Sequence, residues 1–369
     1  MTHKLRVAVI FGGRSGEHEV SLMSAESVIN AIDKTKYEVV PIGITKGGQW
    51  LVSGDPMLAL KSAAASPAKS SALVVDPSQR GLIALEVNQA SGGGQKLDVV
   101  IPVLHGTYGE DGTIQGLLEM ADVPYVGAGV LASAVGMDKS VMKAVFAQRG
   151  IPVLDFLTVK KKDWQRDAEG LTHEIERRIS YPCFVKPACG GSSVGISKVH
   201  SRAELAPAMR LATEFDRKIV VEKSAQNFRE IEISVLGNDE PIASVPGEII
   251  PCNEFYDYRA KYTDDRSQLI IPARLPNATV RKVQRLAVEV FKAVDCAGMA
   301  RVDFFVSKDA SKVYANEINT IPGFTKISMY PKLWEASGIS YGELIDRLIE
   351  LAIKRHMEKR QLRTSYELE

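Results

Sequence analysis

Two stretches of sequence decide the fold and the chemistry of this chain, Val313-Tyr-Ala-Asn-Glu-Ile-Asn-Thr-Ile-Pro-Gly323 and Gly298-Met-Ala-Arg-Val-Asp303. They are predicted to form neighbouring strands. Glu317 and Asn319 are two residues apart, so on a strand both side chains point to the same face, where Asp303 can join them around one cation. Mg²⁺ favours such oxygen ligands and usually binds through one or two carboxylates plus substrate phosphates. The pattern predicts a nucleotide-phosphate site, and a strand pair that ends in solvated acids is the alternative.

Length and composition limit the class of protein. With 369 residues the chain is too long for one core and should divide into two or three domains. A net charge of +1 creates no electrostatic field that would attract nucleic acid or an anionic membrane. No apolar run approaches the length of a membrane-spanning helix. The cysteines follow neither a metal-binding spacing nor a disulfide framework, which indicates the reducing cytoplasm. They are Cys183, Cys189, Cys252 and Cys296.

The N-terminal part alternates strands with helices. A strand is predicted from Val7 to Phe11, followed by a glycine turn and a helix from about Glu17 to Ile32. Further strands are predicted near Tyr37 to Ile44 and from Leu97 to Val103. This alternation predicts an α/β unit with a parallel sheet.

A domain boundary is expected near Val130 to Asp138, just before a helix from Lys139 to Gln148. A central unit then continues to about Ala225, and a strand-rich unit fills the rest of the chain. Leucines recur on one face of the final predicted helix, which runs from Tyr341 to about Arg360.

A glycine-rich segment, Lys186-Pro-Ala-Cys-Gly-Gly-Ser-Ser-Val-Gly195, follows a predicted strand. Its small residues, with Ser192 and Ser193 among them, allow backbone N–H groups to approach phosphate oxygens, and Lys186 adds a positive charge. The spacing is not that of a Walker A loop, so we expect a flap that lies over the phosphates. Lys139 can supply a second cation. A glycine-rich hairpin without function is the alternative.

The stretch Val220-Val-Glu-Lys223 is a short apolar strand that ends in an acid, a suitable place for recognising adenine and ribose. Glu222 and Lys223 are the candidates there, and Glu230 and Glu232 follow on an alternating strand. The alternative for each of these acids is a position on the protein surface.

Six ordered motifs spread along the chain resemble those of the D-alanine–D-alanine ligases, which belong to the ATP-grasp superfamily. They are Gly12 to Ser21, Leu104 to Gly112, Lys186 to Gly195, Tyr256 to Tyr262, Arg301 to Asp303 and Glu317 to Gly323. One departure is Cys189-Gly190, where relatives often carry a polar or charged residue. The resemblance covers essentially the whole chain and implies an α/β, three-domain ATP-grasp fold. Its expected domains are an N-terminal substrate-binding domain (1–135), a central domain with the glycine-rich loop (136–225) and a C-terminal domain with the metal site and a lid (226–369).

The resemblance also implies the reaction, which is ATP-dependent ligation of two D-alanines through an acyl phosphate for peptidoglycan precursor synthesis. Two Mg²⁺ or Mn²⁺ ions per site would be held by Asp303, Glu317 and Asn319. Phosphoryl transfer depends on metal ions, cations and in-line geometry more than on covalent help. Lys139, Lys186 and the loop at Ser192 would therefore neutralise and enclose the phosphates. Arg301 and the backbone N–H of Gly323 would stabilise the tetrahedral oxyanion of the second step.

Substrate recognition is implied in the same way. Glu17 would bind the ammonium of the first D-alanine, with Ser192 acting through Tyr262, and His105 would lie beside this subsite. Ser328 would meet the carboxylate of the second D-alanine. Each has a structural alternative: Glu17 as a first-turn helix acid, His105 as a hydrogen-bonded loop histidine and Ser328 as a helix cap.

The segment from Pro251 to Ile271 is predicted to be a long loop rich in tyrosine and charge, and such loops are usually functional lids. Lys261 and Tyr262 lie in its middle, from which they can reach the active site on closure. Closure would exclude the water that hydrolyses an acyl phosphate.

Three other functions compete with this one. A dinucleotide oxidoreductase fails because Gly12, Gly13 and Gly16 do not form G-x-G-x-x-G, and Glu17 would repel a pyrophosphate. A D-alanine–D-lactate or D-alanine–D-serine ligase stays open, although Tyr262 favours the dipeptide enzyme. A non-catalytic paralogue is disfavoured by the intact set of metal-site candidates. D-alanine and ATP are the expected small-molecule partners, and the resemblance suggests a homodimer.

Overall fold

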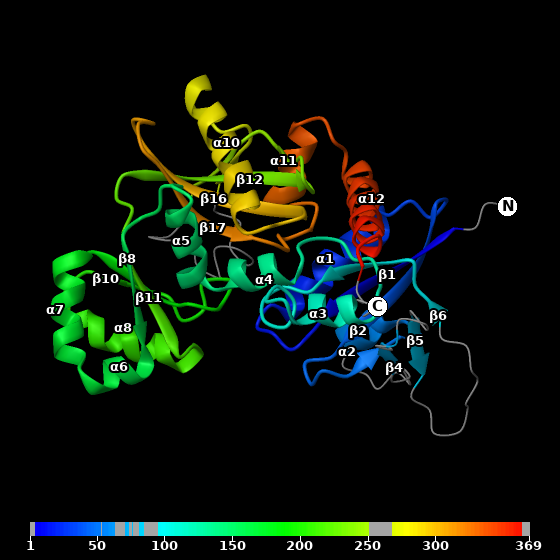
Figure 1. Cartoon of the computed structure of the whole chain (residues 1–369), viewed down its shortest axis with the longest axis horizontal. Coiled ribbons are helices and arrows are strands. Elements are labelled where there is room, and N and C mark those ends of the chain that lie inside the picture. The colour runs from blue at the N-terminus through cyan, green and yellow to red at the C-terminus, as the bar shows by residue number, and fades with distance from the viewer. Residues whose placement is uncertain are drawn as a thin grey trace, which may run out of the picture.

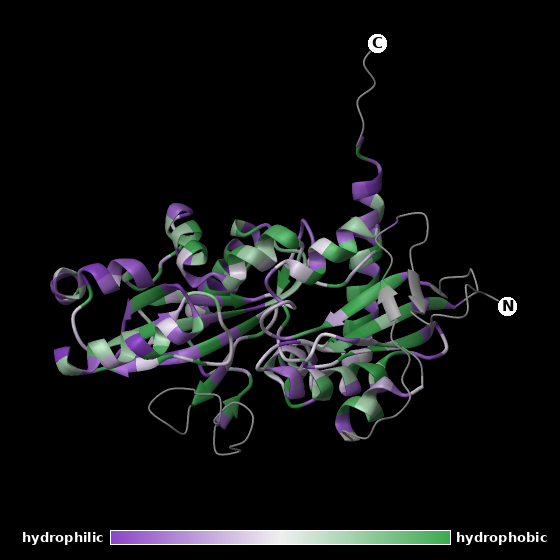
Figure 2. Ribbon diagram, turned by 90° about the horizontal axis from the view of Figure 1, so that it is seen from below, coloured by the Kyte–Doolittle hydropathy of each residue, from purple (hydrophilic) through white to green (hydrophobic). Residues whose placement is uncertain are grey.

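The computed structural model describes residues 4–52, 54–62, 71–73, 76, 81–84, 95–250 and 268–363. Within them, three larger sheets follow one another along the chain. Figure 1 shows the N-terminal sheet at one end of the molecule, the central sheet at the other end and the C-terminal sheet between them. Figure 2 shows that the strands are mostly hydrophobic, whereas several outer helices expose hydrophilic residues.

The N-terminal sheet has the strand order β3-β2-β1-β7, in which β2, β1 and β7 are parallel. The residues Val7 to Phe11 of β1 are fully buried, as expected for a parallel strand that helices cover on both faces. The predicted α/β unit with a parallel sheet is confirmed. The elements of this unit are β1 (Leu5–Gly12), α1 (His18–Ala31), β2 (Tyr37–Ile44), β3 (Trp50–Leu51), α2 (Pro56–Ser62), β7 (Val99–Val103), α3 (Thr113–Met120) and α4 (Val130–Met137).

The turn after β1 requires glycine. Gly12 has φ +90°, and a Cβ atom there would lie 2.2 Å from the carbonyl oxygen of Ile44. The turn brings Glu17 to the carboxyl end of the sheet, immediately before α1, which is the edge where open α/β sheets bind ligands.

A small antiparallel sheet is joined to this unit. It consists of β4 (Ser71–Leu73), β5 (Gly81–Ala84) and β6 (Gln95–Lys96).

The predicted boundary region is helical. The region from 130 to 138, where a boundary is expected, contains α4 and ends at Asp138, the N-cap of α5 (Lys139–Gln148). The division into domains at 135 and 225 stays a prediction.

The central sheet is antiparallel and has the order β10-β9-β11-β8. Cys183 and Val185 of β9 pack with Ile175 and Met209 from the helices on one face. Because side chains alternate along a strand, Lys186 belongs to the opposite face. The elements are β8 (Phe156–Lys160), α6 (Lys161–Arg166), α7 (Ala168–Arg178), β9 (Cys183–Pro187), β10 (Ser197–Val199), α8 (Arg202–Phe215) and β11 (Lys218–Lys223).

The C-terminal sheet has the order β15-β14-β12-β16-β17, and β13 pairs with β12. Ile231 and Ile233 of β12 pack with Val290 of α10 and Phe146 of α5. The predicted helix from Lys139 to Gln148 is confirmed as α5. The elements are α5 (Lys139–Gln148), β12 (Phe228–Gly237), β13 (Ile242–Ala243), β14 (Gly247–Ile250), β15 (Gln268–Ile270), α10 (Asn277–Ala293), β16 (Gly298–Ser307), β17 (Val313–Asn319), α11 (Met329–Ala336) and α12 (Tyr341–Arg360).

One boundary of the predicted lid needs correction. The loop was expected to extend to Ile271, but Gln268–Ile270 forms β15, which pairs with β14. The ladder to β14 gives these residues the backbone partners that a loop would lack. Residues 251–267, with Cys252, Lys261 and Tyr262, lie outside the described residues.

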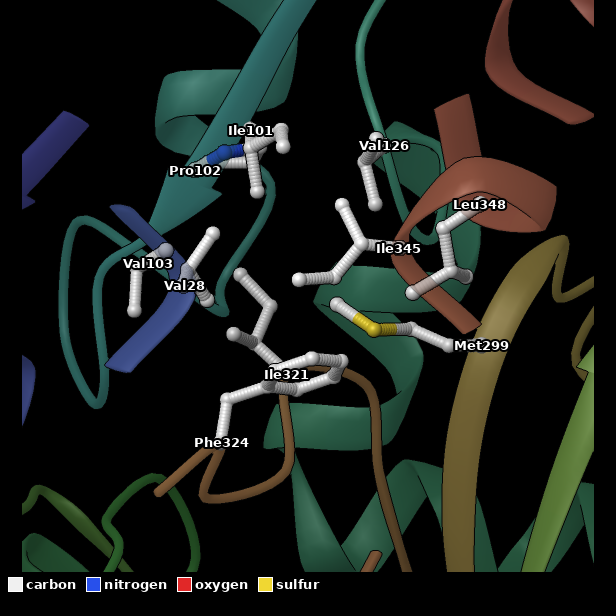
Figure 3. A pocket seen from close by; sticks show the side chains of 10 residues that line it. All are labelled: Val28, Ile101, Pro102, Val103, Val126, Met299, Ile321, Phe324, Ile345 and Leu348. Carbon is white, nitrogen blue, oxygen red and sulfur yellow. The ribbon is translucent and has the colours of Figure 1, made fainter. Parts of the chain in front are cut away.

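The predicted final helix is confirmed as α12, and it packs against the N-terminal unit. Arg355 donates to the carbonyl oxygen of Tyr125 at 3.0 Å and also to that of Gly127. A small apolar cavity remains where the two units meet, and Figure 3 shows Val28 and Ile101 facing Ile345 across it. In the part of the chain that the structure describes, no helix has the length and apolarity needed to cross a membrane.

Candidate active site

The predicted strand pair around Asp303 is present. β16 and β17 are antiparallel, with Asp303 directly opposite Glu317 and Arg301 directly opposite Asn319. The two acids and the amide therefore lie on one face of the sheet, and Asn319 Nδ2 donates to Asp303 Oδ2 at 3.1 Å. Asp303 lies within β16 and not at its end, and the register shifts directly after it.

Arg301 is held by two acids. Its Nε and Nη2 atoms donate to the two carboxylate oxygens of Asp303 at 2.7 and 2.8 Å, and Nε lies 3.0 Å from Glu232 Oε2 on β12. Burial alone would lower the pKa of Arg301, but the charges of Asp303 and Glu232 outweigh it and raise that pKa well above its ordinary value. The guanidinium is thus a permanent, oriented cation beside the metal-site candidates.

These residues fit a hard divalent cation. Asp303 and Glu317 supply carboxylate oxygens from facing positions, and Asn319 supplies an amide oxygen two residues along the strand. Among the described residues, no cluster of three His, Cys, Asp or Glu side chains has metal-binding geometry. A cation bound by these residues would complete its shell with substrate phosphate and water oxygens, as Mg²⁺ usually does.

Glu222 lies between two lysines near the carboxyl end of β11. Its Oε2 is 2.5 Å from Lys186 Nζ, and its Oε1 forms an ion pair with Lys143 Nζ. Only 1% of Glu222 is exposed. Burial alone would raise the pKa of Glu222, but the two ammonium groups outweigh it and lower that pKa to about 2. The proposed role in nucleotide recognition stays a prediction, but the alternative of a surface acid is wrong for Glu222, and also for the buried Glu232.

The glycine-rich loop is tied to the start of α5. The backbone N–H of Lys139 donates to the Ala188 carbonyl at 2.9 Å, and Lys139 Nζ donates to the Gly190 carbonyl at 2.6 Å. Ser192 and Ser193 have φ values of +47° and +61°. Left-handed backbone is uncommon for serine and is concentrated at ligand-binding loops. The role of this loop as a flap over the phosphates stays a prediction.

Two aspartates support this loop from outside. Asp216 Oδ2 accepts a hydrogen bond from the backbone N–H of Cys189 at 2.7 Å. Asp138 caps α5 by accepting from two backbone N–H groups and forms an ion pair with Lys218. Burial and these aspartates raise the pKa of Cys189 to about 12, so its thiol stays protonated at neutral pH and the departure at position 189 adds no nucleophile.

Glu17 connects the N-terminal unit with the glycine-rich loop. It is 8% exposed, and its Oε1 accepts a hydrogen bond from Ser192 Oγ. Gly106 and Gly191 flank its carboxylate, because a Cβ atom at either glycine would lie within 2.8 Å of Glu17 Oε2. Glu17 stands at the N-cap position of α1 but makes no side-chain capping hydrogen bond there, and its role as the ligand of an ammonium group stays a prediction.

His105 is buried near this carboxylate. Its Nδ1 lies 3.0 Å from the Ile321 carbonyl, and its Nε2 lies 3.0 Å from Ser24 Oγ. Burial alone would lower the pKa of His105, but the hydrogen bond and charge of Glu110 outweigh it and raise that pKa. The histidine ties the region around Glu17 to the segment before Gly323.

Gly323 and Ser328 lie side by side, since a Cβ atom at Gly323 would be 3.0 Å from Ser328 Oγ. Ser328 stands at the N-cap of α11 but makes no capping hydrogen bond; its hydroxyl instead accepts from the backbone N–H of Thr325 at 3.1 Å. The two residues therefore border one small region, as a shared substrate subsite requires.

Two nucleotide-site candidates lie on different sheets. Lys223 is half exposed on β11, where its Nζ lies 4.0 Å from Asp155 Oδ2. Glu230 lies on β12, opposite Phe305.

Sequence reasoning missed Lys143 as a member of this site. Its position four residues after Lys139 places both on one side of α5, and a lysine among the apolar residues of that helix is the signal that could have found it. Glu110 and Asp138 were missed because their partners, His105 and Lys218, are identified only by tertiary contact.

Two protein-family models match the chain. The model described as "D-ala D-ala ligase N-terminus" matches residues 6–128, and the model described as "D-ala D-ala ligase C-terminus" matches residues 145–350. A D-alanine–D-alanine ligase of Heliobacterium modesticaldum is 53% identical over 97% of both chains. That of Acetivibrio thermocellus is 52% identical over 96% of this chain and 98% of its own.

Solved structures agree. The D-alanine–D-alanine ligase of Coxiella burnetii has a TM-score of 0.84 and 39% identity, covering 97% of this chain and 96% of that one. The VanG D-Ala:D-Ser ligase of Enterococcus faecalis has the same TM-score and 38% identity, covering 95% of this chain and all of that one. Fold similarity does not separate the two second substrates, but the matched family and the full-length identity are clear: this chain belongs to the D-alanine–D-alanine ligase family.

Proposed function

We propose that this chain joins two molecules of D-alanine to D-alanyl-D-alanine, using ATP and releasing ADP and phosphate, for peptidoglycan precursor synthesis. One observation carries the proposal: the glycine-rich loop reaches Glu17 of the N-terminal unit through Ser192. A carboxylate suited to an amino-acid ammonium thus lies at the edge of a phosphate-binding flap. An enzyme that phosphorylates an amino-acid carboxylate needs this arrangement.

In the first step, an oxygen of the D-alanine carboxylate attacks the γ-phosphorus of ATP, and the bond to the ADP oxygen breaks. Glu17 binds the ammonium of this D-alanine and so fixes the position of its carboxylate. Lys139 and Lys186 neutralise phosphate charge, and the backbone of Ser192 and Ser193 encloses it. Positioning and charge stabilisation of this kind supply most of the catalysis in phosphoryl transfer.

In the second step, the amine of the second D-alanine attacks the acyl carbon, loses its proton, and phosphate leaves. Arg301 and the backbone N–H of Gly323 stabilise the tetrahedral oxyanion. Ser328 binds the carboxylate of the second D-alanine. His105 borders the first subsite.

For the nucleotide, we assign Glu222, Lys223 and Glu230 to the adenine and ribose. Asp303, Glu317 and Asn319 would hold two Mg²⁺ or Mn²⁺ ions, which when bound supply charge neutralisation at the phosphates. We also propose that the enzyme is cytoplasmic and homodimeric. Light scattering after size-exclusion chromatography would test the homodimer.

The deciding experiment measures phosphate release and ligated product with ATP and D-alanine alone, and with D-serine or D-lactate added as the second substrate. The product is an amide with D-alanine or D-serine and an ester with D-lactate. We expect D-alanyl-D-alanine as the main product. A higher kcat/KM with D-serine or D-lactate as the second substrate would replace this proposal with the corresponding ligase. Absence of turnover with all three would favour a non-catalytic paralogue.

Glu17→Gln should raise the KM for the first D-alanine by about 10- to 100-fold, because a hydrogen bond to a charged group contributes ~1.5–3 kcal/mol. The KM values for ATP and for the second D-alanine should change little. Initial rates over a grid of substrate concentrations separate the three values. Glu19→Gln is the matched control, since Glu19 lies in the same helical turn but forms an exposed ion pair with Lys46. Equal effects on all three KM values would assign Glu17 a structural role.

Glu317→Gln should raise the Mg²⁺ concentration that gives half of the maximal rate by about tenfold. The reason is that one anionic oxygen is lost from an ion that binds few protein carboxylates. High Mg²⁺ should restore part of the rate, which a titration at fixed ATP measures. Glu289→Gln, on the exposed surface of α10, serves as the control. An unaltered Mg²⁺ titration would remove Glu317 from the metal site.

A further inference from the structure

Lys143 is a buried cation for which the proposed chemistry has no role. It lies on α5 one turn after Lys139, is 1% exposed, and is flanked on the helix by the buried Met142 and Phe146. A lysine is almost never fully buried unless its charge is paired. Its contacts should therefore explain why a charge is kept there.

The ammonium of Lys143 joins two sheets. It forms an ion pair with Glu222 Oε1 on β11 of the central sheet, and it donates to the carbonyl oxygen of Asn316 on β17 of the C-terminal sheet at 3.2 Å. The other oxygen of Glu222 contacts Lys186. A continuous set of polar contacts thus connects the strand before the glycine-rich loop with the strand that carries the metal-site candidates.

The contact on β17 is made at an irregularity of the ladder. Asp303 pairs with Glu317 and Phe304 pairs with Ala315, so Asn316 is an extra residue with no partner on β16. Such a β-bulge bends its strand and re-aims the neighbouring side chains, and bulges occur often beside active sites. The ammonium of Lys143 supplies a donor to the carbonyl oxygen of this extra residue, directly before Glu317.

We infer that Lys143 is a positioning residue for the nucleotide and its metal ions. It orients the Glu222 carboxylate on the central sheet and stabilises the bulge at Asn316 on the C-terminal sheet. These two contacts keep a fixed distance between the Glu222 part and the metal-ligand part of the nucleotide site. This inference rests on the proposed ATP-dependent function, since it assigns the bound nucleotide to the region between these two sheets.

The test is nucleotide binding by Lys143→Met, which removes the charge and keeps most of the side-chain length. Isothermal titration of the folded enzyme with ADP and Mg²⁺, without D-alanine, should show a Kd raised by about 10- to 100-fold. The KM for ATP should rise similarly, whereas the KM for D-alanine should stay within twofold. Lys161→Met is the matched control, because Lys161 also donates to a backbone carbonyl, that of Thr213, but on the surface.

Three results separate positioning from a merely structural role. Lys143→Arg, which keeps the charge, should recover part of the ADP affinity. Combining Lys143→Met with Glu222→Gln should weaken ADP binding by less than the product of the two single effects, because the residues act as a pair. If Lys143→Met does not fold, Lys143→Arg and Lys143→Gln are compared, and the charged variant should bind ADP more tightly.

Folded Lys143→Met with wild-type ADP affinity and an unchanged KM for ATP would overturn the inference, as would equal ADP affinities for the Arg and Gln variants. Failure of the proposed function is distinguishable from this, because it appears as absence of amide product in the wild-type enzyme. The ADP titration does not depend on amide formation.

Discussion

Arg301→Met is expected to lower the rate of dipeptide formation by about 10²–10³-fold, because removal of one oxyanion donor has an effect of that size. The substitution keeps the bulk of the side chain but removes the planar cation that Asp303 and Glu232 orient. Binding of ATP should change much less, since the guanidinium acts on charge that develops in the transition state. Steady-state kcat and equilibrium ATP binding, measured on the same preparation, give the two values.

Two controls accompany this variant. Arg301→Lys keeps a charge but not the two-pronged donor geometry, so it should recover only part of the rate. Arg347→Met removes an arginine that forms an exposed ion pair with Glu343 on α12, and it should leave kcat unchanged. An Arg301→Met enzyme with more than half of the wild-type kcat would show that Arg301 does not stabilise the oxyanion.

Glu222→Ala is expected to lower the free energy of unfolding by about 3–5 kcal/mol, because breaking a buried ion pair leaves an uncompensated charge. The uncompensated group is Lys143, which is 1% exposed and has Glu222 as its only carboxylate ion-pair partner among the described residues. Urea-induced unfolding followed by circular dichroism measures the loss. Glu214→Ala, at an exposed position of α8 in the same unit, should stay within about 0.5 kcal/mol of wild type.

The pH dependence of this loss follows from the pKa of Glu222. That pKa is lowered to about 2 in the folded protein from an ordinary value of 4.5. A carboxyl group with a lowered pKa stabilises the fold fully above its unfolded pKa, and the contribution disappears as pH falls through the folded value. The difference between wild type and Glu222→Ala should therefore be the same at pH 5 and pH 7. A difference that vanishes by pH 5 would mean that the carboxylate is not held by its two lysines.

Much of the fold could be predicted from local patterns. The apolar run from Val7 to Phe11 with its glycine turn, the helix from Lys139 to Gln148 and the strands that carry Asp303 and Glu317 lie where the sequence indicates. These features depend on side-chain periodicity and on the conformational freedom of glycine, which act over a few neighbouring residues. The end of the predicted lid was wrong because β15 forms by pairing with β14, the strand before residues 251–267, and no pattern within its own three residues indicates that pairing.

The candidate site likewise has one part that the sequence predicts and another part that only tertiary contacts decide. The sequence by itself determined which residues are candidates for its chemistry, because Glu17, Lys186, Arg301 and the residues around Glu317 stand in ordered motifs. Only the tertiary structure decided that Glu222 is buried between Lys143 and Lys186, that Arg301 is shared by Asp303 and Glu232, and that Asn316 leaves the ladder. Burial and ion pairing depend on groups that meet in space from distant parts of the chain, and no local pattern encodes which of several acids will meet which lysine.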